Sequence, residues 1–319
     1  MTLLLALLAC SGPDTPVAPS VLDLRQDYPL PPDGGLQLTS PDLFVPAYSE
    51  HIFCYYGTWL GPDSAVNLLS SYQVLPYNHH NQVKSVPEGG PPDGTLEECD
   101  EEDMRAYQPF IDGVPPYDIA GGANLPPPSE SWNQMDLPDG YAVKLDQGRR
   151  WVLETHYVNT TDQDLLVNSA INLGFMPIED VNTWVGVLQL DSGPPAIPPG
   201  EYTLEFDCAF QTDLEILVVS SHMHENGMAY AVDFLPQDGG SERIHEVPEW
   251  NDGFRAYPKL DVWEPGELTV IAGEVFRTSC SWNNRTEDVL NFPEEMCTTL
   301  VVAAPIEAPL GCYDGLWRE

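Results

Sequence analysis

The sequence contains few basic side chains. Lys and Arg together number 12 against 50 Asp and Glu, so the 319-residue chain has a formal net charge of −38. Such a surface repels nucleic-acid phosphates and anionic lipid head groups, and we expect no nucleic-acid partner. The charge favours solubility and tolerates metal ions or cationic substrates. A solvated acidic exterior is the simpler explanation, so no substrate follows from it.

Long hydrophobic runs are also scarce. The apolar run at residues 1–10 is too short to span a bilayer, and it ends in Leu8, Ala9 and Cys10. It resembles a bacterial lipoprotein signal, in which Cys10 would be lipidated and become the mature N-terminus. We therefore expect an extracytoplasmic protein, which is periplasmic, held at the cell surface by a lipid anchor on Cys10, or secreted.

No two cysteines have the spacing Cys-x-x-Cys, which leaves a zinc knuckle or a thioredoxin-type site without support. An even number of cysteines remains beyond Cys10, and in an exported chain this predicts three disulfides. Many pairings satisfy that prediction, and spacing alone does not choose among them. The six residues are Cys54, Cys99, Cys208, Cys280, Cys297 and Cys312.

Length and proline content predict the fold class. The chain exceeds the usual single-domain size, which favours two domains of about 150 residues each. Its 32 prolines are about twice the average usage and work against long helices. Short apolar stretches separated by turn residues predict an all-β protein with two tandem antiparallel β-sandwich domains of jelly-roll type. No internal repeat is visible in the sequence.

The expected domain organisation follows the composition along the chain. A signal segment at 1–10 precedes a Pro/Gly-rich tether at 11–49, an N-terminal domain at 50–178 and a C-terminal domain at 179–319. Residues 83–139 form a long acidic connection with one helical turn expected at 101–107. Strands are expected at 70–77, 141–145, 150–158, 167–175, 184–190, 201–210, 228–235, 268–272, 275–280 and 298–304.

The most informative stretch is an apolar strand that begins at Leu214 and ends in His222 and His224, before a turn at Asn226-Gly227. Alternate side chains of a strand point the same way, so these two histidines leave one face together while Met223 leaves the other. The Asn-Gly pair predicts a hairpin that fixes them at the strand end. They make half of a metal site, or they are two polar residues at a solvated strand end.

The other histidines are few and grouped. Of seven in the chain, His79 and His80 are adjacent, and His156 lies within a predicted strand. Adjacent side chains on a strand point in opposite directions, so His79 and His80 can reach one metal only where the backbone bends. A pair of exposed loop histidines is the alternative. His51 and His245 are interpreted as ordinary surface residues.

The order of these groups resembles the copper type II, ascorbate-dependent monooxygenases, the family of peptidylglycine α-hydroxylating monooxygenase and dopamine β-monooxygenase. The shared order is His-His, His-Tyr, His-x-His and Glu-Met-Cys, and it covers roughly residues 50–312. Further motifs that carry the resemblance are Leu137–Gly140, Val152–Tyr157, Ile197–Gly200 and Trp282–Asn284 ahead of Glu295–Cys297.

The resemblance implies two copper ions, with ascorbate or another one-electron donor, O2 and a small organic substrate; no protein partner is evident. A copper that supplies electrons would be held by His79, His80 and His156. A copper that binds and activates oxygen would be held by His222, His224 and Met296, whose soft thioether favours Cu(I) over zinc. The family's disulfides would pair Cys54 with Cys99, Cys208 with Cys312 and Cys280 with Cys297.

Departures from the family concern the substrate and the first site. The peptide-amidating members carry an Arg and a Tyr that bind the peptide carboxylate, where this chain has Ser220 and Leu300. This favours an uncharged or cationic substrate. Asn81 and Gln82 replace an apolar pair after His80. Two other classes of function stay open: a secreted copper-binding protein without turnover, and a structural β-sandwich module on a lipid anchor.

Overall fold

The structure is a computed structural model of the chain. It describes residues 20–31, 34–72, 74, 77–99, 108–111, 117–118, 132–193, 195–251, 254, 258–292, 294–307 and 310–318. Within its strands, the side chains of residues 79–80, 108–111, 117–118, 132–135, 310 and 318 are not described. Cys10, the predicted lipidation residue, and the helical turn expected at 101–107 lie outside the described residues.

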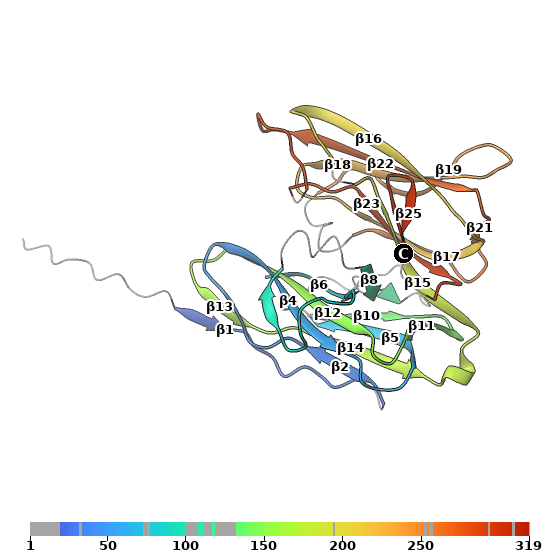
Figure 1. Ribbon diagram of the computed structural model, residues 1–319. Helices are drawn as coiled ribbons and strands as arrows, with labels where there is room; N and C mark the ends of the chain where they lie inside the picture. The colour runs from blue at the N-terminus through green and yellow to red at the C-terminus, as the bar shows by residue number, and fades with distance from the viewer. Residues whose placement is uncertain are drawn as a thin grey trace, which may run out of the picture.

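The fold is all-β, as the composition predicted (Figure 1). Strand β22 (Val275–Asn284) shows the physical reason, because every second side chain along it is buried. One face of such a strand covers a core while the other faces solvent. The turn η1 (Ile178–Asp180) is a short 3-10 helix. None of the helices in the part of the chain that the structure describes has the length and apolar character to cross a membrane.

The first half of the chain is a sandwich of two sheets. One has the strand order β7-β4-β12-β6-β8 and the other begins β2-β14-β5-β11, with β10 and β9 along its edge. The first sheet consists of β7 (Leu96–Glu98), β4 (Ser49–Thr58), β12 (Arg150–Asn159), β6 (Asn78–Ser85) and β8 (Gln108–Ile111). The second contains β2 (Leu36–Thr39), β14 (Ala170–Met176), β5 (Ser64–Tyr72), β11 (Tyr141–Leu145), β10 (Trp132–Asp136) and β9 (Tyr117–Asp118).

The second half is a sandwich of the same kind. Sheet β16-β22-β18-β19 packs on strands β15-β23-β17-β20 around a core that includes Trp282, Phe276 and Ile216. The strands are β16 (Gly200–Ala209), β18 (Gly227–Leu235), β19 (Glu242–Val247), β15 (Thr183–Asp191), β23 (Thr298–Ala304), β17 (Leu214–His222), β20 (Leu260–Val262), β21 (Leu268–Val270), β24 (Leu310–Tyr313) and β25 (Leu316–Arg318).

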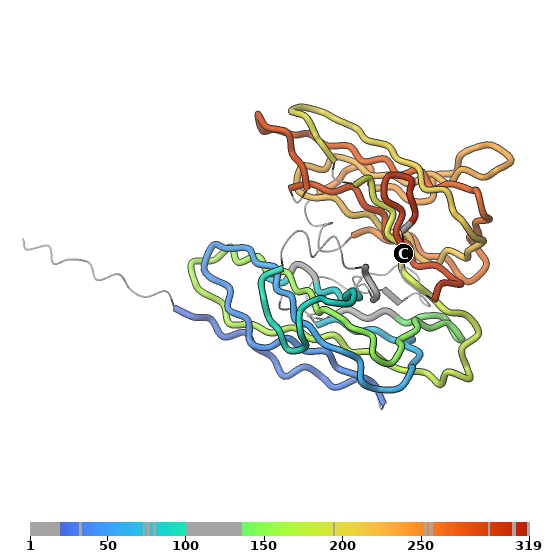
Figure 2. Tube along the Cα trace, viewed as in Figure 1, coloured from blue at the N-terminus to red at the C-terminus, as the bar shows by residue number. Residues whose placement is uncertain are grey.

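The two halves share a sheet and a core. Strands β11 and β15 pair in parallel, which joins β2-β14-β5-β11 to β15-β23-β17-β20 as one sheet. One apolar cluster contains Val143 and Leu153 from the first half together with Leu217 and Val302 from the second. The colours of Figure 2 separate the halves into a blue-to-green body and a yellow-to-red body. The second half therefore presents one face of its shared sheet to the first half.

The structure reveals a repeat that the sequence does not show. The order β2-β14-β5-β11 in the first half is matched by β15-β23-β17-β20 in the second, and β4-β12-β6 is matched by β16-β22-β18. Strand β4 pairs with β12 over ten residues up to Asn159, and β16 pairs with β22 over ten residues up to Asn284. The repeat is therefore present in the strand order of the two halves, although no repeat is visible in the amino-acid sequence.

Register shifts fall at matching places in both halves. The β12/β6 register passes from His156/His80 to Tyr157/Asn78, so His79 is an extra residue. The β22/β18 register passes from Ser281/Ala229 to Trp282/Gly227, so Met228 is extra. Strands β5 and β17 carry a matching pair of extra residues at Asn67 and Leu217. The register shift between β12 and β6 falls at His79, His80 and His156, the three residues predicted to hold the first copper.

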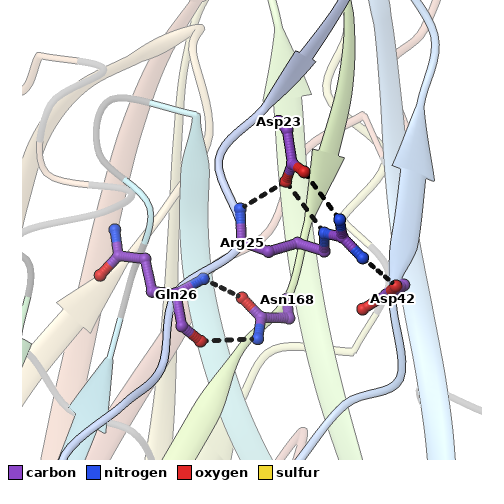
Figure 3. Close-up of polar contacts among 5 residues, drawn as sticks. All are labelled: Asp23, Arg25, Gln26, Asp42 and Asn168. Carbon is purple, nitrogen blue, oxygen red and sulfur yellow. Dashed lines mark hydrogen bonds and ion pairs between the residues drawn. The ribbon is translucent and has the colours of Figure 1, made fainter.

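The tether predicted at 11–49 is wrong for residues 20–49. Strands β1 (Val21–Asp23) and β3 (Leu43–Val45) pair with β13 (Asp164–Val167), and β2 pairs with β14. Gln26 and Asn168 exchange two hydrogen bonds of 3.0 Å, and Arg25 binds Asp23 and Asp42 (Figure 3). The segment belongs to the fold because its backbone and polar side chains find partners along β13 and β14.

Candidate metal centres

His222 and His224 lie at the end of β17, on the face that the second half turns toward the first. Cross-strand register aligns Val218 of β17 with Val302 of β23, and both belong to the core that the halves share. His222 lies four residues beyond Val218 and therefore leaves the same face. Met223, between the histidines, is fully buried in the core of the second sandwich. The predicted orientation of the pair is therefore confirmed.

The two imidazoles converge. Their Nε2 atoms are 3.2 Å apart, and the rings are close to perpendicular with centroids 5.1 Å apart. Ring nitrogens bind metal ions at about 2 Å, so two nitrogens at this separation could both bind one ion. The pair thus has the spacing of two ligands on one ion.

A backbone contact selects the tautomer of His224. Its Nδ1 lies 3.2 Å from the carbonyl oxygen of Glu294. A carbonyl only accepts, so the proton of the neutral ring is on Nδ1 and the lone pair is on Nε2, which faces His222. Metal-binding histidines commonly donate their other ring N–H to a carbonyl or carboxylate in this way.

Glu295 ties the segment that contains Met296 to the histidine turn. Its fully buried carboxylate accepts hydrogen bonds from the backbone N–H of His224 at 3.0 Å and of Asn226 at 2.6 Å, and from Trp282 Nε1 at 3.0 Å. Burial raises the pKa of Glu295, while these three donors oppose that rise. Met296 directly follows this residue, so its backbone lies next to a fixed contact with the histidine turn.

The disulfides also fasten this segment. Cys280 of β22 is bonded to Cys297, so Met296 lies between the buried Glu295 and a cystine. Met296 itself is partly exposed. All three pairings implied by the family resemblance are confirmed: Cys54–Cys99, Cys208–Cys312 and Cys280–Cys297. Disulfides of this kind are typical of proteins that fold in oxidising compartments outside the cytoplasm.

The sheet face that leads to His222 changes from apolar to polar. Thr298 donates to Asp191 at 2.6 Å beside His222. Neither Lys nor Arg occurs among the nine residues of the three rows that the register aligns on this face. The rows are Val187, Val302 and Val218; Gln189, Leu300 and Ser220; and Asp191, Thr298 and His222.

The first predicted site is centred on the register shift in β6. His156 of β12 stands directly opposite His80, and His79 is the extra residue of the shift. In a bulge two residues oppose one, which bends the strand and re-aims side chains. This is the bend that adjacent histidine ligands require. The side chains of His79 and His80 lie outside the described residues, so their part in a metal site stays a prediction.

His156 is buried and has a carboxylate partner. The residue is 3% exposed, and Nε2 lies 2.8 Å from Glu50 Oε1. The contact places the ring proton on Nε2, so the lone pair of the neutral imidazole is on Nδ1. A histidine bonded to a carboxylate through one nitrogen and to a metal through the other is a common arrangement in metalloproteins. His156 therefore fits a ligand role.

The strand predicted at 70–77 is wrong at Val74 and Tyr77, which are not in a strand. β5 ends at Tyr72, and the backbone N–H groups of Tyr77 and Asn78 both donate to the carbonyl of Val74. The chain turns there, and β6 starts at Asn78. The histidines therefore lie near the start of a strand and not after its end.

Sequence reasoning missed a buried polar layer beneath the register shift. Asn78 and Asn81 are 2% and 0% exposed, and the Asn78 amide nitrogen lies 3.1 Å from Asn81 Oδ1 and 3.2 Å from Thr155 Oγ1. Asn81 in turn donates to the carbonyl of Tyr72. The sequence signal was Asn81, noted only as a departure from the family.

The interpretation of His245 as a surface residue is wrong. It is 1% exposed, its Nδ1 lies 2.8 Å from Asp261 Oδ2, and its ring packs edge-on against Tyr230. Burial lowers the pKa of His245, and the hydrogen bond to Asp261 only partly opposes this. His51 is partly exposed and contacts Glu98.

A further three-donor cluster does not make a metal site. Among the described residues, donor atoms of Cys54, Cys99 and Glu154 lie within 4.8 Å of one another. The two sulfurs are bonded to each other, and the Glu154 carboxylate lies 2.6 Å from the buried Lys84 ammonium. These groups are structural.

Comparisons with known proteins identify no family. No protein-family model matches the chain, and no curated protein matches it. Among solved structures, the infectious bursal disease virus Gx strain is similar at 10% identity and a TM-score of 0.22, over 86% of this chain and 73% of that chain. The VP2 subviral particle of that virus is also 10% identical with a TM-score of 0.22, over 90% and 74%. Such low scores carry no argument about this protein.

Proposed function

We propose that this protein is a copper-dependent monooxygenase that hydroxylates a C–H bond of a small organic substrate. The observation that supports this best is the 3.2 Å approach of the His222 and His224 Nε2 atoms, together with the Glu295 carboxylate that binds the same turn. That contact binds the backbone of the histidine turn to the residue that precedes Met296. Two nitrogens and a thioether form a donor set suited to copper, in particular to Cu(I).

The reaction consumes one O2, one substrate C–H group, two electrons and two protons, and it yields one alcohol and one water. Bound copper supplies one-electron chemistry toward O2 and the substrate. The electrons come from ascorbate or another one-electron donor. His79, His80 and His156 would hold a second ion that supplies electrons, and the Glu50 contact of His156 supports a ligand role.

The protein's own contribution at the oxygen site is orientation. The Glu294 carbonyl keeps the His224 proton on Nδ1, and the buried Glu295 carboxylate fixes the backbone of His224 and Asn226. The disulfide from Cys297 to Cys280 holds the other end of the Met296 segment. These contacts fix His224 and the backbone on both sides of Met296 without a metal, which lowers the ordering cost of metal binding.

We assign a neutral or cationic substrate to this site. The face beside His222 presents Ser220, Thr298 and Asp191, with neither Lys nor Arg in its aligned rows. A substrate carboxylate would be repelled by the Asp191 carboxylate, and none of the nine aligned positions supplies a Lys or Arg to bind it. The protein acts outside the cytoplasm, and we assign a lipid anchor at Cys10.

Metal analysis tests the proposal. Copper-loaded wild-type protein should contain two copper ions per chain, and at limiting metal His222→Ala or Met296→Ala should contain one. Glu295→Gln, which replaces one acceptor oxygen with an amide nitrogen facing N–H donors, should also lose copper at this site. His51→Ala removes a histidine assigned to neither site and should keep both ions. Equal copper content in His222→Ala and wild type would contradict the site.

Turnover is tested by oxygen consumption with ascorbate. We expect copper-loaded wild type to consume O2 in the presence of small amines or alcohols, and more slowly with the matching carboxylates. His222→Ala should show no such consumption. Binding of two coppers without consumption under every condition would identify a copper-binding protein without turnover.

A further inference from the structure

Asn78 lies at the register shift beneath the first predicted copper site. It is the first residue of β6, it is 2% exposed, and it immediately precedes His79. Its amide nitrogen lies 3.1 Å from Asn81 Oδ1, 3.2 Å from Thr155 Oγ1 and 3.3 Å from the carbonyl oxygen of His156. One side chain thus contacts both strands that carry the predicted ligands.

We call the contacts of the Asn78 amide with Asn81 and with the His156 carbonyl the amide bracket. Asn78 and Asn81 flank His79 and His80 on β6, and the amide links them directly across the two residues. The contact to the His156 carbonyl joins this bracket to the strand of the third ligand. The Asn78 amide therefore fixes β6 against β12 at the register shift.

The bracket is anchored to the rest of the first half. The Asn81 amide donates to the Tyr72 carbonyl at 2.8 Å, which ties it to β5 in the opposite sheet. Thr155 Oγ1 lies 2.9 Å from Ser169 Oγ, just before β14. A relaxed backbone at the shift would break buried hydrogen bonds to both sheets.

The second half shows the same register shift without the bracket. There Gly227 occupies the position of Asn78, and a Cβ at Gly227 would lie 2.6 Å from Trp250 Cδ1, so no side chain fits. The positions that match His80 and His156 hold Ala229 and Ser281. The amide bracket thus occurs in the half whose shift carries histidines.

We propose that Asn78 is a positioning residue for the copper site of His79, His80 and His156. Its amide fixes the backbone of β6 at the register shift that carries His79 and His80. This inference rests on the proposed function. Residues that orient metal ligands typically change metal affinity by about 10–100-fold when they are mutated.

The test uses the full-length protein carrying His222→Ala, so that only copper binding at the site of His79, His80 and His156 is measured. Adding Asn78→Ala should weaken Cu(II) binding at least about tenfold by competition titration and should alter the Cu(II) EPR spectrum. Asn172→Ala is the matched control, because Asn172 is also 2% exposed in the first half but bonds Gln37 and the Tyr72 hydroxyl, whereas Asn81 bonds the Tyr72 carbonyl. It should leave affinity and spectrum unchanged.

A second variant covers the case in which Asn78→Ala does not fold. Thr155→Val keeps the side-chain volume but removes one of the three acceptors, and it should weaken Cu(II) binding by a smaller factor and shift the same EPR lines. Unchanged affinity and spectrum in Asn78→Ala, or in Thr155→Val if it alone folds, overturns the inference. Absence of first-site copper in the His222→Ala parent instead contradicts the proposed function.

Discussion

At the scale of single residues, His245 shows how burial changes chemistry. Its imidazole joins β19 to β20 through Asp261, inside a core where a charge is poorly solvated. The pKa of His245 is therefore below its ordinary value of 6.5. The unfolded chain takes up a proton as the pH falls through that value, while the folded protein does not.

We accordingly predict that the free energy of unfolding decreases as the pH falls below about 6.5, by at most about 1.4 kcal/mol per pH unit from this group. His245→Asn removes the titrating group and keeps an N–H for Asp261. It should flatten the pH dependence between pH 7 and 5.5, measured by denaturant unfolding at each pH.

His51→Asn is the matched control for this experiment. His51 also contacts a carboxylate through Nδ1 at 2.8 Å, but its ring is partly exposed. The slope of His245→Asn is compared with that of His51→Asn, which removes a histidine–carboxylate contact outside the core. Equal slopes in wild type and His245→Asn would show that the burial of His245 does not control stability in this range.

At the scale of elements, the ends of β12 and β22 are closed by the same motif. Asn284 Oδ1 accepts from the backbone N–H and the hydroxyl of Thr286, and its Nδ2 donates to the carbonyls of Ile197 and Asp288. Asn159 makes the matching contacts with Thr161 and Gln163. Each amide ends a ten-residue strand and fixes the loop that follows.

Asn284→Ala and Asn159→Ala should each lower the free energy of unfolding by about 1–3 kcal/mol, because each removes a buried amide that hydrogen-bonds on both sides of the strand end. Chemical denaturation of the variants measures the change. Asn283→Ala, next to the motif, should stay within about 0.5 kcal/mol of wild type. A comparable loss in Asn283→Ala would mean that the motif has no special role.

At the scale of the whole molecule, the two halves form one structural unit. The β11–β15 pairing and the shared apolar cluster connect them. Leu217, the extra residue of the register shift in β17, is fully buried in that cluster. Because the two halves share this core, unfolding one half would expose apolar surface of the other, and we expect both to unfold together.

Leu217→Ala should destabilise the protein by about 2–5 kcal/mol through the cavity that it leaves. Calorimetry should show one unfolding transition in wild type, and the variant should shift that transition as a whole. Ile271→Ala, at an exposed position, should cause little change. Two separate transitions, of which Leu217→Ala moves only one, would contradict this prediction.

The sequence predicted what depends on local pattern. Alternation of apolar residues and turn residues predicted the strands 141–145 and 298–304 with the observed bounds. The same alternation placed His222 and His224 on one face. Six cysteines predicted three disulfides, and the family resemblance supplied their pairing.

Only the tertiary structure decided which distant groups meet. The contacts of Glu295 with His224, of Asn78 with His156 and of His245 with Asp261 depend on the register between strands that lie apart in the sequence. Local pattern sets which face a side chain leaves, since that is a property of one strand. The partner it finds there, and whether it is buried, depend on how separate strands pair and how the sheets pack on each other.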